Sequence, residues 1–160
     1  MNTGFFDWLK INNWTYEKND KINITDIAIR DRYNNIPEEF IDFLTMFKSI
    51  TSADETTWFL CNDDYTDDSE DAFRWNEFEI MSIEAAGDDN IWKDEIVKWW
   101  TTKLPFILSV NNGYSYYAID LENSNGTIVR GEEPEFEDTV VVANSFDDFI
   151  CKLINEELYI

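Results

Sequence analysis

The stretch PFILSVNNGYSYYAIDL, residues 105–121, decides the fold because it holds two strands and the turn between them. Residues 105–110 form a continuous apolar run, which is typical of a strand that is covered on both faces. Residues 111–113 (NNG) accept the positive φ angles of a tight hairpin turn. Residues 114–121 are predicted to return as the next strand, so this part of the chain begins an antiparallel sheet.

Further strands are predicted on both sides of this hairpin. After a turn at residues 123–126 (NSNG), residues 127–130 and 139–143 are expected to form a third and a fourth strand. Residues 56–61 are rich in residues that favour strands and are expected to enter the same sheet. Residues 73–83 are predicted to be a strand, or a strand with a turn.

Helices are predicted before, between and after these strands. Residues 3–14 form a short helix, and residues 91–101 form another that follows two aspartates. Ser145 caps a last helix with one apolar stripe. A further helix opens at residues 36–39 (IPEE), with proline and two acids in its first turn. Its apolar face is expected to contain Phe40, Phe43, Leu44 and Phe47. The predicted class is α+β, a largely antiparallel sheet covered by helices, as one domain over residues 1–160.

The composition combines a large negative charge with an ordinary core. The chain has 34 Asp and Glu against 12 Lys and Arg, a net charge of −22, yet 44% of its residues are hydrophobic and 16% are aromatic. Such a chain folds, and its surface charge repels nucleic acids and favours a basic protein partner. Adaptation to high salt is an alternative that the many isoleucines and large aromatic residues disfavour.

The absence of histidine excludes several classes of enzyme. Neither a Ser-His-Asp nor a Cys-His pair can form, and the two cysteines are too few for a zinc site made of thiolates alone. The chain has no phosphate-binding or dinucleotide-binding glycine motif. Chemistry based on carboxylates remains open, with Glu77 and Glu79 on one face of the strand predicted there. We expect no enzyme, no cofactor and no metal site.

The densest acidic segment is predicted to be an exposed loop over residues 62–71 that binds the basic partner. Its charges steer association, and aromatic rings within it and at Trp75 slow dissociation. It lacks the glycine of an EF-hand loop, so no specific calcium site is expected. A second acidic insert, residues 132–138, is expected to extend the acidic face. The alternative for each is a solvated loop that only keeps the protein soluble. The candidate partner-binding residues are Asp63, Asp64, Tyr65, Asp67, Asp68, Glu70, Asp71, Glu132, Glu133 and Glu135.

The sequence also allows predictions about the burial of tryptophans and cysteines, the location of the protein and its oligomeric state. Trp92 and Trp99 are predicted to pack on the core and Trp100 to be partly exposed. Cys61 and Cys151 are predicted to be buried thiols in a reducing cytosol, with a disulfide as the alternative. The chain has no long apolar run and no basic start followed by an apolar segment, so we expect a cytoplasmic protein without a membrane span. A monomer or weak dimer is expected.

Four segments in order carry a family resemblance. They are IPEEFIDFL (36–44), PFI (105–107), NGYSYYAID (112–120) and ANSFDDFI (143–150). This succession resembles the Smi1/Knr4 (SUKH) superfamily over residues 30–155, with a proline-acid-aromatic helix start, a strand pair and a terminal helix. Ser115 departs from the pattern, because many members have an acid near the glycine.

The resemblance implies a bacterial immunity protein that binds and neutralises a cognate toxin domain without chemistry. Many such toxins are nucleases with positive clefts, which an acidic protein can occupy as a mimic of the phosphate backbone. The alternative is a regulatory or scaffold member of the same superfamily with another partner.

Overall fold

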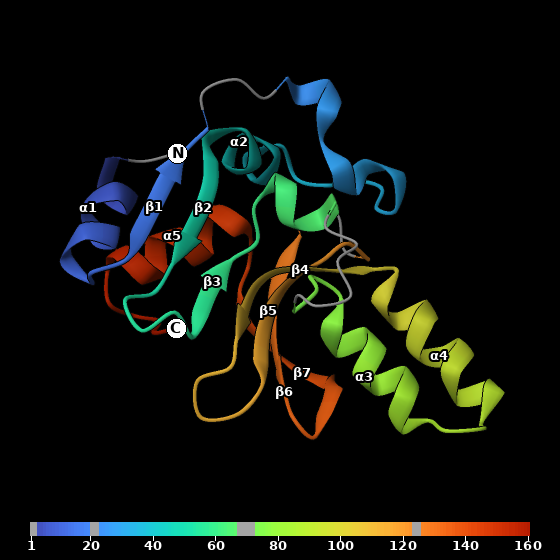
Figure 1. Cartoon of the computed structure of the whole chain (residues 1–160). Coiled ribbons are helices and arrows are strands. Elements are labelled where there is room, and N and C mark those ends of the chain that lie inside the picture. The colour runs from blue at the N-terminus through green and yellow to red at the C-terminus, as the bar shows by residue number, and fades with distance from the viewer. Residues whose placement is uncertain (1–2, 20–22, 67–72, 123–125) are drawn as a thin grey trace.

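The computed structural model describes residues 3–19, 23–66, 73–122 and 126–160. Within these ranges, seven strands form one sheet in which spatial order follows sequence order and every neighbouring pair is antiparallel (Figure 1). The predicted α+β class is therefore confirmed. The strands are β1 (Thr15–Lys18), β2 (Phe47–Thr51), β3 (Thr57–Phe59), β4 (Lys103–Ser109), β5 (Ser115–Asp120), β6 (Thr127–Glu132) and β7 (Glu135–Ala143).

The hairpin predicted from residues 105–121 is present as β4 and β5. Every residue of β4 is buried, as expected for a strand that is covered on both faces. The turn between the strands has positive φ angles at Asn112 (56°) and Gly113 (114°). Ile107 pairs with Tyr117 in the register that this turn sets.

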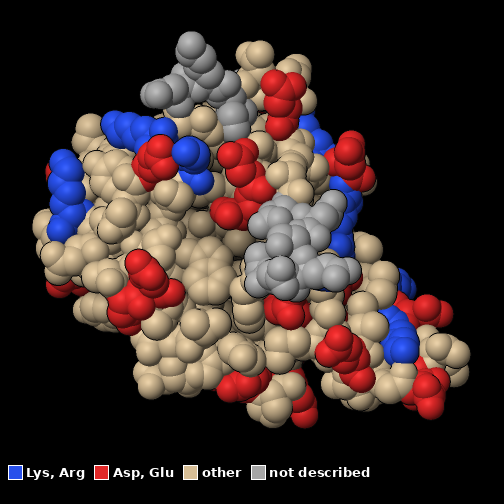
Figure 2. Space-filling view, viewed as in Figure 1, with Lys and Arg blue, Asp and Glu red and all other residues tan. Residues whose placement is uncertain are grey.

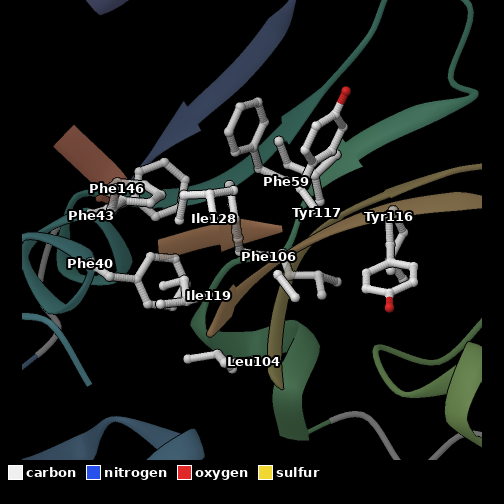
Figure 3. Close-up of a cluster of buried hydrophobic side chains, with 14 of the residues drawn as sticks. Phe40, Phe43, Phe59, Leu104, Phe106, Tyr116, Tyr117, Ile119, Ile128 and Phe146 are labelled. Atoms are coloured by element: carbon white, nitrogen blue, oxygen red, sulfur yellow. The ribbon is translucent and has the colours of Figure 1, made fainter. Parts of the chain in front are cut away.

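Helices cover both faces of the sheet. Tyr116 and Tyr117 are neighbours on β5, so their rings point to opposite faces (Figure 3). Tyr117 packs on Phe149, whereas Tyr116 packs on Phe78 and Trp100. The helix that carries Phe149 therefore lies on one face, and the two that carry Phe78 and Trp100 lie on the other. The helices are α1 (Thr3–Ile11), α2 (Glu38–Met46), α3 (Glu77–Ala85), α4 (Asn90–Trp100) and α5 (Phe146–Ile154).

The core between the sheet, α2 and α5 is built from phenylalanines. Phe146 of α5 lies 5.1 Å from Phe40, 5.3 Å from Phe43 and 5.3 Å from Phe106 between ring centroids, and all four side chains are buried (Figure 3). Each buried phenylalanine contributes roughly 1.5–3 kcal/mol through the hydrophobic effect. Edge-to-face pairs such as these add about 0.5–1.5 kcal/mol each.

The longest excursion from the sheet lies between β3 and β4. These strands pair directly, with Phe59 opposite Ile107, although residues 60–102 separate them in the chain. The described part of this excursion contains the 3-10 helix η3 (Asn62–Thr66), α3 and α4. Figure 1 shows α3 and α4 as an antiparallel pair that projects from one side of the molecule.

The prediction of a strand at residues 73–83 is wrong, because α3 occupies Glu77–Ala85. The helix buries Phe78, Glu79 and Ser82, so polar residues occupy positions where a helical stripe would be apolar. Glu79 tolerates burial because Arg32 donates to both of its carboxylate oxygens, at 2.8 and 2.7 Å. The sequence of α3 therefore lacks the apolar stripe from which an amphipathic helix is predicted.

The helix that opens at residues 36–39 ends one residue earlier than its apolar spacing suggests. Phe47 has extended backbone angles, φ −117° and ψ 139°, and begins β2 instead of continuing α2. Its side chain is nevertheless fully buried, as predicted. β1 and β2 were not predicted, because β1 has four residues and both strands expose polar side chains. Short 3-10 helices, η1 (Ile24–Asp26) and η2 (Ala28–Asp31), precede α2.

Candidate partner-binding surface

The first acidic segment begins with η3, which is held against the sheet. Asp64 accepts a hydrogen bond from the backbone N–H of Cys61 at 2.7 Å. Tyr65 is buried, and its hydroxyl donates to the carbonyl of Pro105 at 2.6 Å. Tyr65 therefore fixes η3 to β4, while Asp63 is exposed. Four of the predicted residues lie outside the described part of the chain: Asp67, Asp68, Glu70 and Asp71.

The second acidic insert is mostly strand and not the loop that we predicted. Glu132 ends β6 and Glu135 begins β7, so only Glu133 and Pro134 form the turn. All three glutamates are exposed. Glu132 pairs with Arg130 at 2.7 Å, which leaves Glu133 and Glu135 to present their charge to solvent.

The structure places η3, which is the described part of the first acidic segment, and the acidic turn at residues 132–135 at opposite ends of the sheet. η3 is attached through Tyr65 to Pro105, near the beginning of β4. The acidic turn lies near the other end of β4, because Ser109 pairs with Ser115 and Ser115 pairs with Glu132. Asp63 and Asp64 of η3 are therefore separated from the acidic turn. Figure 2 shows the acidic side chains of one side of the molecule in separate groups with broad uncharged areas between them.

Three partly exposed rings form what we call the aromatic patch: Trp58, Phe73 and Tyr114. Phe73 is 38% exposed, and its ring centroid lies 5.6 Å from that of Trp58 and 6.0 Å from that of Tyr114. Phe78 of α3 lies beneath, 5.6 Å from Phe73 and 5.9 Å from Tyr114. The patch therefore has a rigid base and an exposed top.

The aromatic patch lies between η3 and the acidic turn. Trp58 is on β3, which leads directly to η3. At the other side, the backbone N–H of Glu133 donates to the carbonyl of Tyr114 at 2.9 Å. Aromatic rings that are flanked by acidic groups suit a protein partner with apolar and cationic side chains.

Our sequence analysis did not identify the aromatic patch, although one signal was available. Trp58 alternates on β3 with Thr57 and Phe59, which are both buried, so its ring had to point to the other face. Phe73 and Tyr114 gave no such signal, because only the tertiary structure brings them to Trp58.

Arg32 and Glu79 form a partly buried ion pair. Arg32 binds Glu79 as described above, and its guanidinium lies 5.1 Å from the ring centroid of Trp75 and 5.4 Å from that of Tyr33. Burial raises the pKa of the Glu79 carboxyl, and the attraction of Arg32 opposes this only in part. Glu77 does not share a face with Glu79, since α3 is a helix; its carboxylate instead accepts from the backbone N–H of Arg74 at 3.3 Å.

Two tryptophans of α4, Trp92 and Trp100, differ from their predicted positions, whereas Trp99 packs against the core as predicted. Trp100 is buried, and its indole N–H donates to the Glu137 carboxylate at 2.7 Å. Trp92 is 48% exposed, and Trp99 is half-buried. The reason is that Ile96 and Trp100, four residues apart, form the face of α4 that is buried.

Both cysteines are free thiols, so the alternative of a disulfide is excluded. Cys61 is buried as predicted, whereas Cys151 is exposed, contrary to the prediction, because it lies on the outer side of α5. Among the described residues, no helix combines the length and the apolar character that a membrane span requires.

The antiparallel sheet with helices on both faces defines a Smi1/Knr4-like α+β protein. Comparison with known families supports the same assignment: the chain matches the SMI1 / KNR4 family (SUKH-1) over residues 11–152 and belongs to it. A search of the curated proteins finds no match. The predicted superfamily is thus confirmed, and the immunity branch stays a prediction.

Proposed function

We propose that this chain is an immunity protein that binds and neutralises a basic, nuclease-type toxin domain inside the bacterial cytoplasm. It acts by occupying the toxin, without catalysis, cofactor or metal. The observation that carries the proposal is the aromatic patch between η3 and the acidic turn on a chain with a net charge of −22. Membership of the SUKH-1 family is consistent with this role.

The two features of the surface have different tasks in the proposed complex. The acidic groups steer a cationic toxin and raise its association rate from about 10⁵–10⁶ to as much as 10⁸–10⁹ M⁻¹s⁻¹ at low salt. The rings of the aromatic patch lose water on binding and slow dissociation, as central aromatic residues of protein interfaces do. A regulatory or scaffold protein with another basic partner would use the same surface, so identifying the partner decides between the two functions.

The partner is tested by capturing the product of a toxin gene directly upstream of this gene. The immobilised chain is incubated with that product at low salt, and cells that carry both genes are tested for survival. We expect a stoichiometric complex and protection. A toxin that neither binds nor is neutralised contradicts the immunity function, and capture of a non-toxic partner supports the regulatory alternative.

Two variants then test the surface. Phe73→Ala is expected to weaken binding by about 2 kcal/mol, or roughly thirtyfold, mainly through faster dissociation. A variant in which Asp63, Asp67 and Asp68 are all replaced with asparagine is expected to bind the toxin more slowly, and its association rate should depend less on salt. Asp64 is left unchanged because it holds the backbone of η3. Trp92→Ala is the matched control, since this exposed ring lies on α4, outside the aromatic patch. Equal losses for Phe73→Ala and Trp92→Ala would contradict the proposed surface.

A further inference from the structure

β7 is the last strand of the sheet, and part of its edge is open. Among the described residues, β6 is the only strand that pairs with it. Val140 and Val141 are 60% and 65% exposed. Neighbouring residues on a strand point to opposite faces, so neither face is covered at this point. We call residues 139–141 the β7 window.

Helices contact β7 on either side of this window. Toward the start of the strand, Phe136 is buried and stacks on Phe78 of α3 with ring centroids 4.6 Å apart. Toward its end, the Lys152 ammonium of α5 donates to the carbonyl of Val142 at 2.8 Å. Edge strands usually carry lysine or proline to prevent pairing with another chain. The β7 window has neither residue.

An acidic hollow adjoins the β7 window. It measures about 360 Å³, and Val140 lines it together with four carboxylates, those of Glu132, Glu133, Glu135 and Asp138. Arg130 also lines the hollow and is paired with Glu132 at 2.7 Å. The other three carboxylates have no ion-pair partner among the described residues, so the hollow favours cationic side chains.

We propose that an extended segment of the basic partner adds to the β7 window as a further strand. Its backbone pairs with the free edge, and lysine or arginine side chains at alternate positions enter the acidic hollow. The inference rests on the proposed function for the positive charge of the partner. A second copy of this chain is a poorer occupant, because it would bring the same carboxylates against those of the first.

The test uses two peptides of equal charge, acetyl-Lys-Val-Lys-Val-Lys-Val-amide and acetyl-Lys-Pro-Lys-Pro-Lys-Pro-amide. Proline has no backbone N–H and fixes φ at about −65°, so the second peptide loses half of its backbone donors and does not readily form a regular strand. Affinity is measured by calorimetry at several salt concentrations, and hydrogen exchange is followed at residues 139–141. We expect the valine peptide to bind at least tenfold more tightly than the proline peptide and to slow exchange in the β7 window.

Two variants of the full chain complete the test. V140K combined with V141K is expected to weaken binding of the valine peptide at least tenfold, while I11K leaves it unchanged. Ile11 is a matched control because it is 76% exposed at the end of α1. Equal affinity for both peptides, no binding, or no effect of the paired substitution overturns the proposal. If the wild-type chain sediments as a dimer and V140K with V141K makes it a monomer, the β7 window pairs with a second copy of the chain, and the proposal is overturned. Capture of the toxin separates this proposal from the proposed function. If F73A weakens capture and V140K with V141K does not, strand addition is refuted while the proposed function stands.

Discussion

Replacing Arg32 with methionine tests the partly buried ion pair between Arg32 and Glu79. The Glu79 side chain is 6% exposed and would lose two charged hydrogen bonds, of 2.8 and 2.7 Å. Removing one partner of a buried pair typically costs 3–5 kcal/mol, because the other charge stays buried. We expect about 3 kcal/mol here, the lower end of that range, since Glu79 can take up a proton. For a chain of this length, that corresponds to a decrease in Tm of about 6–12 °C.

The assay is urea unfolding followed by tryptophan fluorescence, together with calorimetry. Arg30→Met is the matched control, because Arg30 lies in η2 only two residues before Arg32 but is exposed. This control should change the free energy of unfolding by no more than about 0.5 kcal/mol. If Arg32→Met costs less than about 1 kcal/mol, or no more than the control, the carboxylate of Glu79 is not held as we describe.

The pH dependence of stability provides a second measure of the same pair. The pKa of Glu79 is raised above its ordinary value of 4.5, so the folded state binds this proton more tightly than the unfolded state does. Its contribution to stability is therefore complete below that value and is lost as the pH rises through the raised pKa. Glu79→Gln should flatten the decrease in stability across this weakly acidic range, and an unchanged slope would contradict the assignment.

Three further predictions concern the fold. Gly131→Ala should cost about 1–3 kcal/mol in urea unfolding, because a Cβ there would lie 2.5 Å from the ring of Tyr116, which is fully buried. Ser145→Ala should cost about 1 kcal/mol in the same assay, because its hydroxyl accepts from a backbone N–H in the first turn of α5. Cys151 should react with a thiol reagent in the folded protein and Cys61 only after unfolding, since burial raises the pKa of the Cys61 thiol; rapid reaction at both would contradict the burial of Cys61.

Local sequence signals account for much of the fold. The β4–β5 hairpin follows from an apolar run, a turn and a second run within residues 105–121, and the cap of α5 follows from Ser145. α3 could not be predicted in the same way. Glu79 is buried in it because of Arg32, which lies 47 residues earlier in the chain.

The candidate surface was predictable in composition but not in arrangement. The acidic segments are visible in the sequence, yet the separation of η3 from the acidic turn depends on the register that places Glu132 opposite Ser115. The aromatic patch requires β3, the residue Phe73 and the beginning of the β4–β5 return to meet in space. Contacts between segments that are distant in the chain leave no periodic pattern within any one segment, so the aromatic patch could not be predicted.

The direct pairing of β3 with β4 has a consequence for how such proteins diverge. Phe59 and Ile107 pair across the base of residues 60–102, so the pairing of β3 with β4 does not depend on the length of that block. Hydrogen bonds from Tyr65 to Pro105 and from Trp100 to Glu137 hold this block to the sheet. Its outer residues can change without disturbing the strands. New partner specificity can therefore arise through changes at the outer residues of one contiguous stretch of the gene, while the residues that pack on the sheet are kept.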